Sequence, residues 1–262
     1  MSPTAFITGA SQGIGKATAL LFAKNGYDLV ITARTKDKLE AVAEEIRSLN
    51  RQVLAISTDV GNHSALEALI NLGLERFSQI DVLVNNAGIC MTAPMAKTTI
   101  EDWQTIINVN LWGYIHTINL MLPHFLERKQ GSIINVGSFG GKVPLPNMTA
   151  YCTSKYAVTG LTETLRLELE PQGIHVSGVH PSVTNSDFLE RAVFKDSDPE
   201  QMKQMLSSPF VSQPEDVAQA IWDAVKYPQA EVIVGSAKVP TFLNRLFPSI
   251  TQGMLQLGTK TN

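Results

Sequence analysis

Tyr151 and Lys155 stand four positions apart in this sequence. In a helix, this spacing places both side chains on one face, one turn apart. A nearby ammonium favours the ionised phenol, so the pair predicts a proton donor and acceptor that works nearer neutral pH than the ~10 of free tyrosine. Ser138 precedes the same helix, at the end of an apolar run, and we expect its hydroxyl to lie beside the phenol and polarise a carbonyl oxygen.

The helix that would carry this pair belongs to a chain in which apolar runs alternate with amphipathic stretches. Buried strands are predicted at residues 4–8, 28–32, 53–56, 81–84, 132–136, 174–179 and 231–234. Helical periodicity occupies residues 13–25, 37–49, 65–77, 101–128 (in two pieces), 151–170 and 214–226. This alternation, with strands apolar throughout, is typical of an α/β protein whose doubly wound parallel sheet carries helices on both faces.

The whole chain, residues 1–262, is expected to form one domain. Residues 186–212 lack periodicity and are predicted to form a substrate flap, and residues 239–262 form an apolar, proline-broken C-terminal extension. Residues 111–125 are apolar nearly all round, which favours burial against the sheet and a partner subunit.

Composition narrows the class of protein. Apolar residues make up 44% and charged residues 17%, as in ordinary globular enzymes, and the net charge of −3 favours neither nucleic acid nor an anionic membrane. No run approaches the ~18 apolar residues of a membrane span, and the apolar run near Ala5 leads straight into a glycine-rich turn, so we expect no signal peptide. Cys90 and Cys152 lack metal-ligand spacing and the five histidines are scattered, so we expect reduced thiols, no metal and a cytoplasmic location.

A glycine-rich loop, TGASQGIG at residues 8–15, joins the first predicted strand to the first helix. Gly9 suits a turn that other residues resist, Gly13 lets the backbone approach a pyrophosphate, and Gly15 permits close helix packing. The first amides of the helix would then face the phosphates. We expect this loop to bind a dinucleotide through Gly9, Ser11, Gln12, Gly13, Ile14 and Gly15.

The second strand ends in Ala33-Arg34, where NAD-specific folds carry an acidic residue for the adenosine ribose. Ala33 has no carboxylate to repel a 2′-phosphate, and Arg34 is suited to bind one, so NADP(H) is the expected cofactor. The alternative is that Arg34 is only a solvated surface residue. After the third strand, Asp59 and Val60 are expected beside the adenine, with a helix N-terminal role for Asp59 as the alternative.

The fourth strand ends in Asn85-Asn-Ala-Gly88. The small residues leave room for a ribose, and the amides are suited to fix neighbouring strand ends, so Asn86, Ala87 and Gly88 are expected at the cofactor. Asn110 falls within a predicted helix, and because asparagine is a poor helix former it indicates a kink or a bound water there.

These motifs resemble the single-domain short-chain dehydrogenase/reductase family: TGASQGIG at 8–15, NNAG at 85–88, Asn110, Ser138 and YCTSK at 151–155 occur in family order and spacing. The resemblance spans residues 4 to about 234. It implies that Tyr151 is the acid/base, that Ser138 holds the substrate oxygen, and that Lys155 binds the nicotinamide ribose and lowers the tyrosine pKa. It further implies that Asn110 anchors a water, within a Rossmann-type sheet of about seven strands that assembles into homodimers or homotetramers.

The sequence departs from the family pattern in three places. After the sixth strand the family commonly has Pro-Gly and then a threonine, whereas this chain has Pro181, Ser182 and Ser186, with Val183 between them. Pro181, Val183 and Ser186 are still expected at the nicotinamide. Gln12 replaces a second basic residue of many NADP enzymes, and the tail lacks the Asp-Gly-Gly ending of bacterial 3-oxoacyl carrier-protein reductases.

The function predicted from these residues is reversible, NADP(H)-dependent reduction of a carbonyl compound to an alcohol. Two alternatives remain: a 3-oxoacyl-thioester reductase, and a cofactor-binding regulator without turnover. Of the neighbouring residues, His180 is interpreted as structural, and Cys152 is expected to point away from Tyr151.

Apolar residues in three loops predict a lipophilic substrate, since burying apolar surface gains ~25 cal/mol per Å². They could instead merely pack the flap and a subunit interface. They lie in the flap (Phe188, Leu189, Ala192, Val193, Phe194, Met202, Met205, Leu206, Phe210), after Ser138 (Val143, Pro144, Leu145, Pro146, Met148) and after Asn86 (Cys90, Met91, Met95).

Overall fold

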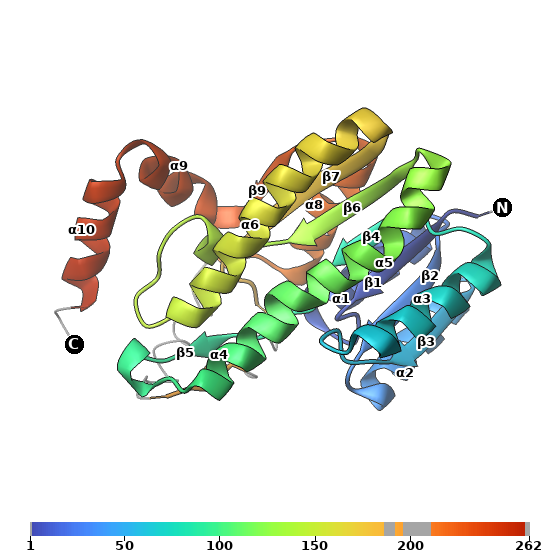
Figure 1. Ribbon diagram of the computed structural model, residues 1–262, viewed down its shortest axis with the longest axis horizontal. Coiled ribbons are helices and arrows are strands. Elements are labelled where there is room, and N and C mark those ends of the chain that lie inside the picture. Colours follow the sequence, from blue (N-terminus) through green and yellow to red (C-terminus); the bar gives the residue numbers. More distant parts are fainter. Residues whose placement is uncertain (1, 186–191, 196–210, 260–262) are drawn as a thin grey trace.

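A seven-stranded parallel sheet forms the centre of the computed structural model, which describes residues 2–185, 192–195 and 211–259 (Figure 1). Its strand order is β3-β2-β1-β4-β6-β7-β9, and every described pair in it is parallel. The strands are β1 (Thr4–Thr8), β2 (Asp28–Ala33), β3 (Val53–Ser57), β4 (Val82–Asn85), β6 (Gly131–Val136), β7 (Ile174–Pro181) and β9 (Glu231–Val234). The predicted doubly wound α/β fold is therefore confirmed.

Helices cover both faces of this sheet. On one face, α1 (Gly13–Lys24), α2 (Lys36–Ser48) and α8 (Pro214–Lys226) pack against strand residues in one apolar cluster. On the other, α3 (His63–Phe77), α5 (Gly113–Arg128) and α6 (Thr149–Leu169) form a second cluster and lie in front of the sheet in Figure 1. The strand order reverses between β1 and β4, and at such a switch point the carboxyl ends of the strands open a crevice for ligands.

The long helical region before β6 is broken, as its asparagine indicated. Helix α4 (Ile100–Ile107) runs through a π-helical turn (Asn108–Trp112) into α5. A π turn inserts extra backbone into a helix and is often found at functional sites. Here it carries Asn110, whose side chain is fully buried.

Two features were not predicted. A second, two-stranded sheet pairs β5 (Met91–Thr92) with β8 (Val193–Phe194), and strands of two residues leave no periodic pattern in a sequence. The C-terminal extension forms two helices, α9 (Lys238–Leu246) and α10 (Pro248–Thr259), with the break at the proline. Short helical turns occupy Met95–Lys97, Phe139–Gly141, Glu170–Gln172 and Gly235–Ala237.

A buried polar chain ties the central strands to the helices that carry the predicted site. Thr117 of α5 donates to Asn85 Oδ1 (2.6 Å), Asn85 Nδ2 donates to Asn135 Oδ1 (3.0 Å), and Asn135 Nδ2 donates to Thr162 of α6 (3.0 Å). Buried hydrogen bonds of this kind fix one arrangement, because breaking one leaves an unpaired polar group away from water. Helices α5 and α6 are therefore held at a set position over β4 and β6.

Most of the predicted flap, including Ser186 and Phe188, lies outside the described residues. Within the described part of the chain, none of the helices combines the length and apolar character that a bilayer crossing requires.

Candidate active site

Ser138, Tyr151 and Lys155 meet at the carboxyl end of β6. Tyr151 and Lys155 lie one turn apart in α6 and are only 6% and 3% exposed. Ser138 follows β6 in an extended conformation, and its Oγ accepts a hydrogen bond from Gly140 N (3.1 Å). A hydrogen bond also joins the Ser138 side chain to Tyr151. The two hydroxyls therefore stand together, in the arrangement that a carbonyl oxygen between them would need.

Lys155 is held by the strand and by an aromatic ring. Its Nζ donates to Val136 O (3.0 Å), the same oxygen that accepts from the Tyr114 hydroxyl (2.8 Å). Nζ also lies 5.4 Å from the centre of the Tyr114 ring, a cation–π distance. Burial disfavours the charged form and lowers the pKa of Lys155 to about 8.

Burial raises the pKa of Tyr151, and the hydrogen bond with Ser138 acts in the opposite direction. The lowered pKa expected from the helical spacing is therefore not produced by the protein alone. The reason is that removal from water outweighs the Ser138 contact, while the Lys155 ammonium is directed at Val136 O.

Asn110 connects three segments around the pair. Its Oδ1 accepts from Ile89 N (2.8 Å), and its Nδ2 donates to Ile89 O (2.9 Å) and to Ser154 Oγ (3.0 Å). Ser154 donates in turn to Tyr151 O (2.7 Å). Asn110 thus fixes the loop after β4 against the first turns of α6, and its role in anchoring a water stays a prediction. Ser154 was not singled out in the sequence, although it lies between Tyr151 and Lys155.

The glycine-rich loop has the geometry expected of a phosphate-binding turn. Gly9 and Gly13 adopt positive φ angles of 68° and 54°, a conformation that favours glycine. A Cβ on Gly15 would lie 2.2 Å from Gly9 O, so α1 packs against the loop only without a side chain there. Gln12 does not cap α1, and the first turn has no acidic residue. The amide end of α1 therefore fits an anion.

The NNAG segment joins this loop to the predicted catalytic residues. Asn86 Nδ2 donates to Thr8 O (3.0 Å), and Thr8 Oγ1 accepts from the amides of Asn86 (3.0 Å) and Ala87 (3.1 Å). A Cβ on Gly88 would lie in ordinary contact with Asn110 Oδ1 (3.4 Å) and Lys155 Nζ (3.7 Å), so Gly88 lies directly beside both side chains. The residues present therefore fit a dinucleotide: the amides at the start of α1 would hold its phosphates, and Lys155 would bind at its other end.

Arg34 follows β2 and is exposed, and none of the hydrogen bonds or ion pairs among the described residues uses its guanidinium. A second cation comes from α2: Lys38 Nζ lies 3.0 Å from Gln12 Oε1. The sequence did not reveal Lys38, because its approach to the loop depends on how α2 packs beside α1. Both cations would be available to a phosphate at the end of β2.

Asp59 and Val60 have local structural roles. Asp59 is exposed, and its Oδ1 accepts from Gly61 N (2.9 Å). The Val60 side chain packs in the core, and its carbonyl oxygen lies 3.2 Å from His116 Nδ1. Their predicted place beside an adenine stays a prediction.

The segment after β7 shows what replaces the Pro-Gly pair. Pro181 ends β7, Val183 O accepts from Ser212 N (3.0 Å), and the hydroxyls of Ser182 and Ser212 lie 3.1 Å apart. Ser182 thus adds a side-chain bond across the two ends of the flap. His180 pairs with Glu231 (3.2 Å), in agreement with a structural role.

Cys152 does not point away from the site. It packs with Cys90, Leu145 and Met148 around Tyr151, and its Sγ would lie 3.4 Å from a Cβ on Gly140. The helical spacing was misleading because the segment after Ser138 folds over the start of α6. Burial raises the pKa of Cys90 to about 12, so this thiol is not nucleophilic near neutral pH.

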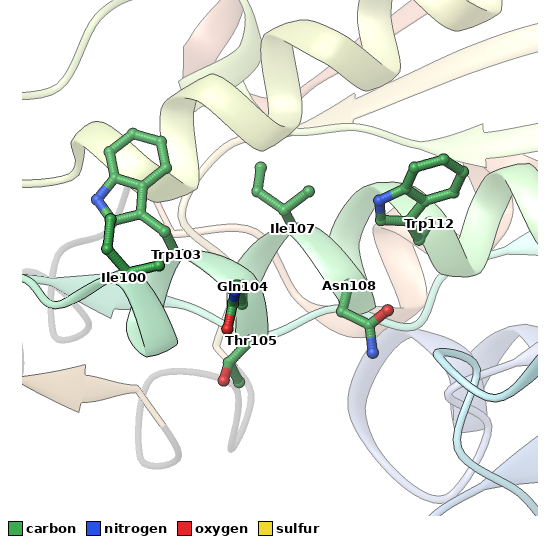
Figure 2. A pocket seen from close by; sticks show the side chains of 7 residues that line it. All are labelled: Ile100, Trp103, Gln104, Thr105, Ile107, Asn108 and Trp112. Atoms are coloured by element: carbon green, nitrogen blue, oxygen red, sulfur yellow. The ribbon is translucent and has the colours of Figure 1, made fainter.

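A separate pocket of about 500 Å³ lies on the outer side of α4 and the π turn (Figure 2). None of the predicted site residues lines it. Its lining residues are Ile100, Trp103, Gln104, Thr105, Ile107, Asn108 and Trp112.

Comparison with known proteins decides the family. The family model described as short chain dehydrogenase matches residues 3–196. The chain belongs to the short-chain dehydrogenase/reductase family. One relative within it, the 3-oxoacyl-[acyl-carrier-protein] reductase of Synechocystis, is 35% identical over 88% of this chain and 92% of its own.

Solved structures of short-chain dehydrogenases/reductases agree with this assignment. The enzyme of Sphingobium yanoikuyae in complex with NADPH is 31% identical, with a TM-score of 0.78 over 88% of this chain and 87% of its own. The enzyme of Burkholderia phymatum in complex with NAD is 26% identical, with a TM-score of 0.82 over 88% of both chains. The chain is thus an oxidoreductase of a family whose members bind either nicotinamide cofactor.

The burial of the Lys155 ammonium should lower the free energy of unfolding of the wild-type protein. We expect Lys155→Met to raise the free energy of unfolding at pH 7 by roughly 1–3 kcal/mol, because it removes a charge whose burial lowers its pKa. Between pH 8 and 10.5 the unfolded wild-type chain binds more protons at Lys155 than the folded one, so wild-type stability rises and the advantage of the variant shrinks. Urea unfolding at pH 7, 8, 9 and 10 measures both effects.

The exposed Lys24→Met at the end of α1 is the control, with an expected change within ~0.5 kcal/mol at each pH. A Lys155→Met protein less stable than wild type at pH 7 would contradict the prediction.

Proposed function

We propose that this chain is an NADP(H)-dependent oxidoreductase that reversibly reduces a lipophilic ketone or aldehyde to an alcohol. The observation that carries the proposal is that the buried side chains of Tyr151 and Lys155 lie together with Ser138, and that Gly88 lies beside Lys155. A binding protein without turnover has no need of a phenol and a serine hydroxyl poised together over a buried cation.

The chemistry follows from the positions of these groups. A bound reduced nicotinamide supplies the hydride. The hydroxyls of Ser138 and Tyr151 both donate hydrogen bonds to the substrate oxygen, and Tyr151 transfers its proton as negative charge develops there. Lys155 stabilises the phenolate left behind. Burial raises the pKa of Tyr151 in the protein without substrate. Tyr151 is therefore protonated before the reaction, as a proton donor for carbonyl reduction must be.

Arg34 and Lys38 support NADP(H) as the cofactor. Ala33 presents no carboxylate at the end of β2, while Arg34 is exposed and Lys38 lies at the loop through Gln12. Gln12 stands where many NADP enzymes have a second basic residue, and Lys38 supplies a basic side chain beside it. Solved relatives contain NADPH in one case and NAD in another, so the local charges of this chain carry the assignment.

The lipophilic substrate is supported by three apolar segments that meet at Tyr151. Leu145, Met148 and Ala192 pack on its cluster with the two cysteines. Backbone bonds hold the segments together, from Val193 N to Cys90 O (3.0 Å) and from Ala93 N to Asn147 O (2.7 Å). A substrate entering here would meet apolar side chains and few charges.

Two alternatives have distinct tests. Reduction of a 3-oxoacyl thioester uses the same chemistry, and the Synechocystis relative bears that name. A non-catalytic NADP(H)-binding regulator would show cofactor binding without turnover. Assembly into a homodimer or homotetramer and a cytoplasmic location stay predictions, and the exposed Ile100 and Trp112 at the pocket of Figure 2 are where we would place a subunit contact.

Removing the proposed acid tests the mechanism. Tyr151→Phe should lower kcat/KM for a ketone by roughly 10²–10⁴, because general acid catalysis is lost, with little change in NADPH affinity. Turnover is followed at the nicotinamide absorbance, and cofactor affinity by fluorescence titration. Tyr156→Phe, in the same helix but 41% exposed, is the matched control and should keep wild-type values. Near-normal turnover of Tyr151→Phe would exclude the proposed acid.

Exchanging the residues at the end of β2 tests the choice of cofactor. A charge-assisted contact with the 2′-phosphate is worth about 1.5–3 kcal/mol, so Arg34→Leu should lose roughly ten- to a hundredfold of the preference for NADPH over NADH. Ala33→Asp combined with Arg34→Leu should reverse the preference. Arg47→Leu, on the following helix α2 and paired with Glu40 and Glu44, should leave this preference unchanged. A wild-type enzyme that prefers NADH would refute the assignment.

A substrate series tests the apolar wall and the thioester alternative together. We expect kcat/KM to rise from small polar carbonyls to aryl and long-chain ketones, by about 25 cal/mol for each Å² of apolar surface buried. Leu145→Ser should flatten this trend, whereas the exposed Leu167→Ser should not. An acetoacetyl thioester that is reduced faster than every free ketone would replace the proposal by its thioester alternative.

A further inference from the structure

Helix α9, the first of the two helices of the C-terminal extension, is oriented with its polar side toward the protein. Thr241 is only 8% exposed, and Asn244 Nδ2 donates to Lys142 O (2.9 Å) in the segment between Ser138 and Tyr151. Two other polar atoms on this side, Thr241 Oγ1 and Asn244 Oδ1, are buried without a hydrogen-bond partner. In Figure 1, α9 and α10 lie at one end of the molecule, with α10 away from the sheet.

The opposite side of α9 is apolar and faces outward. Its residues follow the i, i+3, i+4, i+7 pattern of a helix face that would normally be buried. The pattern continues past the bend into α10, and together these residues form the tail face: Val239 (66% exposed), Phe242 (61%), Leu243 (42%), Leu246 (52%), Phe247 (52%) and Ile250 (62%). Six of the fifteen large apolar side chains exposed among the described residues thus fall within twelve positions. A surface of this kind marks an interaction site.

Charge identifies the kind of partner. Lys238 and Arg245 are exposed, lie along one edge of the tail face, and take part in none of the ion pairs among the described residues. Residues 232–262 contain no aspartate or glutamate, although the whole chain has a net charge of −3. The tail is therefore a cationic, apolar element on an otherwise acidic protein.

We propose that the tail face docks on the surface of an anionic lipid bilayer. The apolar side chains would enter the boundary between headgroups and acyl chains, as in helices that lie in the plane of a membrane. Lys238 and Arg245 would remain at the headgroups, where each cation is attracted by anionic lipid. No crossing of the bilayer is involved.

A second copy of this chain suits the face less well. A two-fold contact brings the same patch together on both subunits. It would place Lys238 and Arg245 near the same cations of the other copy, with no acidic residue in 232–262 to pair them. Anionic lipid provides the missing countercharge.

Docking of the tail face would also bring the candidate active site at Tyr151 close to the lipid. Through Lys142, α9 is joined to the segment that contains Leu145 and Met148 at Tyr151. If the proposed function holds, an apolar carbonyl compound dissolved in the bilayer would meet these residues first. The docking itself does not depend on that function.

The test uses the full-length protein and vesicles of phosphatidylcholine, with or without 30 mol% phosphatidylserine, separated by sedimentation. The wild-type protein should bind the anionic vesicles strongly and the neutral ones weakly, and in high salt its binding to anionic vesicles should fall to the level of the neutral ones. Phe242→Ser with Leu246→Ser should lower binding to anionic vesicles at least tenfold. Lys238→Gln with Arg245→Gln should lower it roughly five- to thirtyfold and leave the neutral vesicles unaffected.

Matched controls are Leu167→Ser, an exposed apolar residue on α6, and Lys24→Gln, an exposed lysine on α1, both with wild-type binding. Thermal unfolding and sedimentation velocity accompany every variant and should not change. The proposal is overturned if the wild-type protein does not sediment with anionic vesicles. Tail variants that dissociate an oligomer also overturn it, because the face would then be a subunit contact.

Discussion

The Lys155 ammonium is almost completely buried, so the neighbouring structure must supply the polar and aromatic partners that water would otherwise provide. At 3% exposure the charge keeps few contacts with solvent, and burial lowers its pKa to about 8. Within the protein, the ammonium donates a hydrogen bond to Val136 O and lies over the face of the Tyr114 ring. Each comes from a different element, so β6, α5 and α6 must hold their mutual positions if the cation is to have any partner. The polar chain from Thr117 to Thr162 joins the same elements and supplies that rigidity.

The same requirement explains the π turn before α5. An uninterrupted α-helix through residues 100–128 would carry Asn110 in another direction, and its two bonds to Ile89 and one to Ser154 would not form together. Those bonds position the loop that ends in Cys90 and the helix turn that carries Tyr151. A local irregularity in one helix thus sets the distance between two walls of the site, and Gly88 lies beside Asn110 and Lys155.

The spacing of apolar residues was sufficient to predict the seven-stranded sheet and the helices that cover it. The glycine-rich loop, NNAG, YCTSK, Asn110 and Ser138 were sufficient to indicate the family. Each of these signals depends on residue types that can be read directly along the sequence. The pKa of Tyr151 was not predictable in the same way: its direction depends on burial by segments that precede and follow it, which a four-residue spacing does not describe. Lys38, Tyr114 and Ser154 were missed because they reach the site through tertiary packing rather than through a motif. Cys152 was misjudged because the segment after Ser138 folds over its helix, and Ser186 lies outside the described residues.

The net charge of the whole chain was an incomplete guide to membrane binding, because it sums over separate surfaces, each of which can bind a different partner. A value of −3 argues against an anionic membrane only if the charges are evenly spread, and residues 232–262 carry cations without a single acid. The orientation of α9 adds what the sequence alone lacks. A helix with this pattern would ordinarily turn Phe242 and Leu246 inward, yet here Thr241 and Asn244 face the protein. Since exposed apolar surface is unfavourable in water, this orientation makes sense for a protein whose working surroundings include a second, apolar phase.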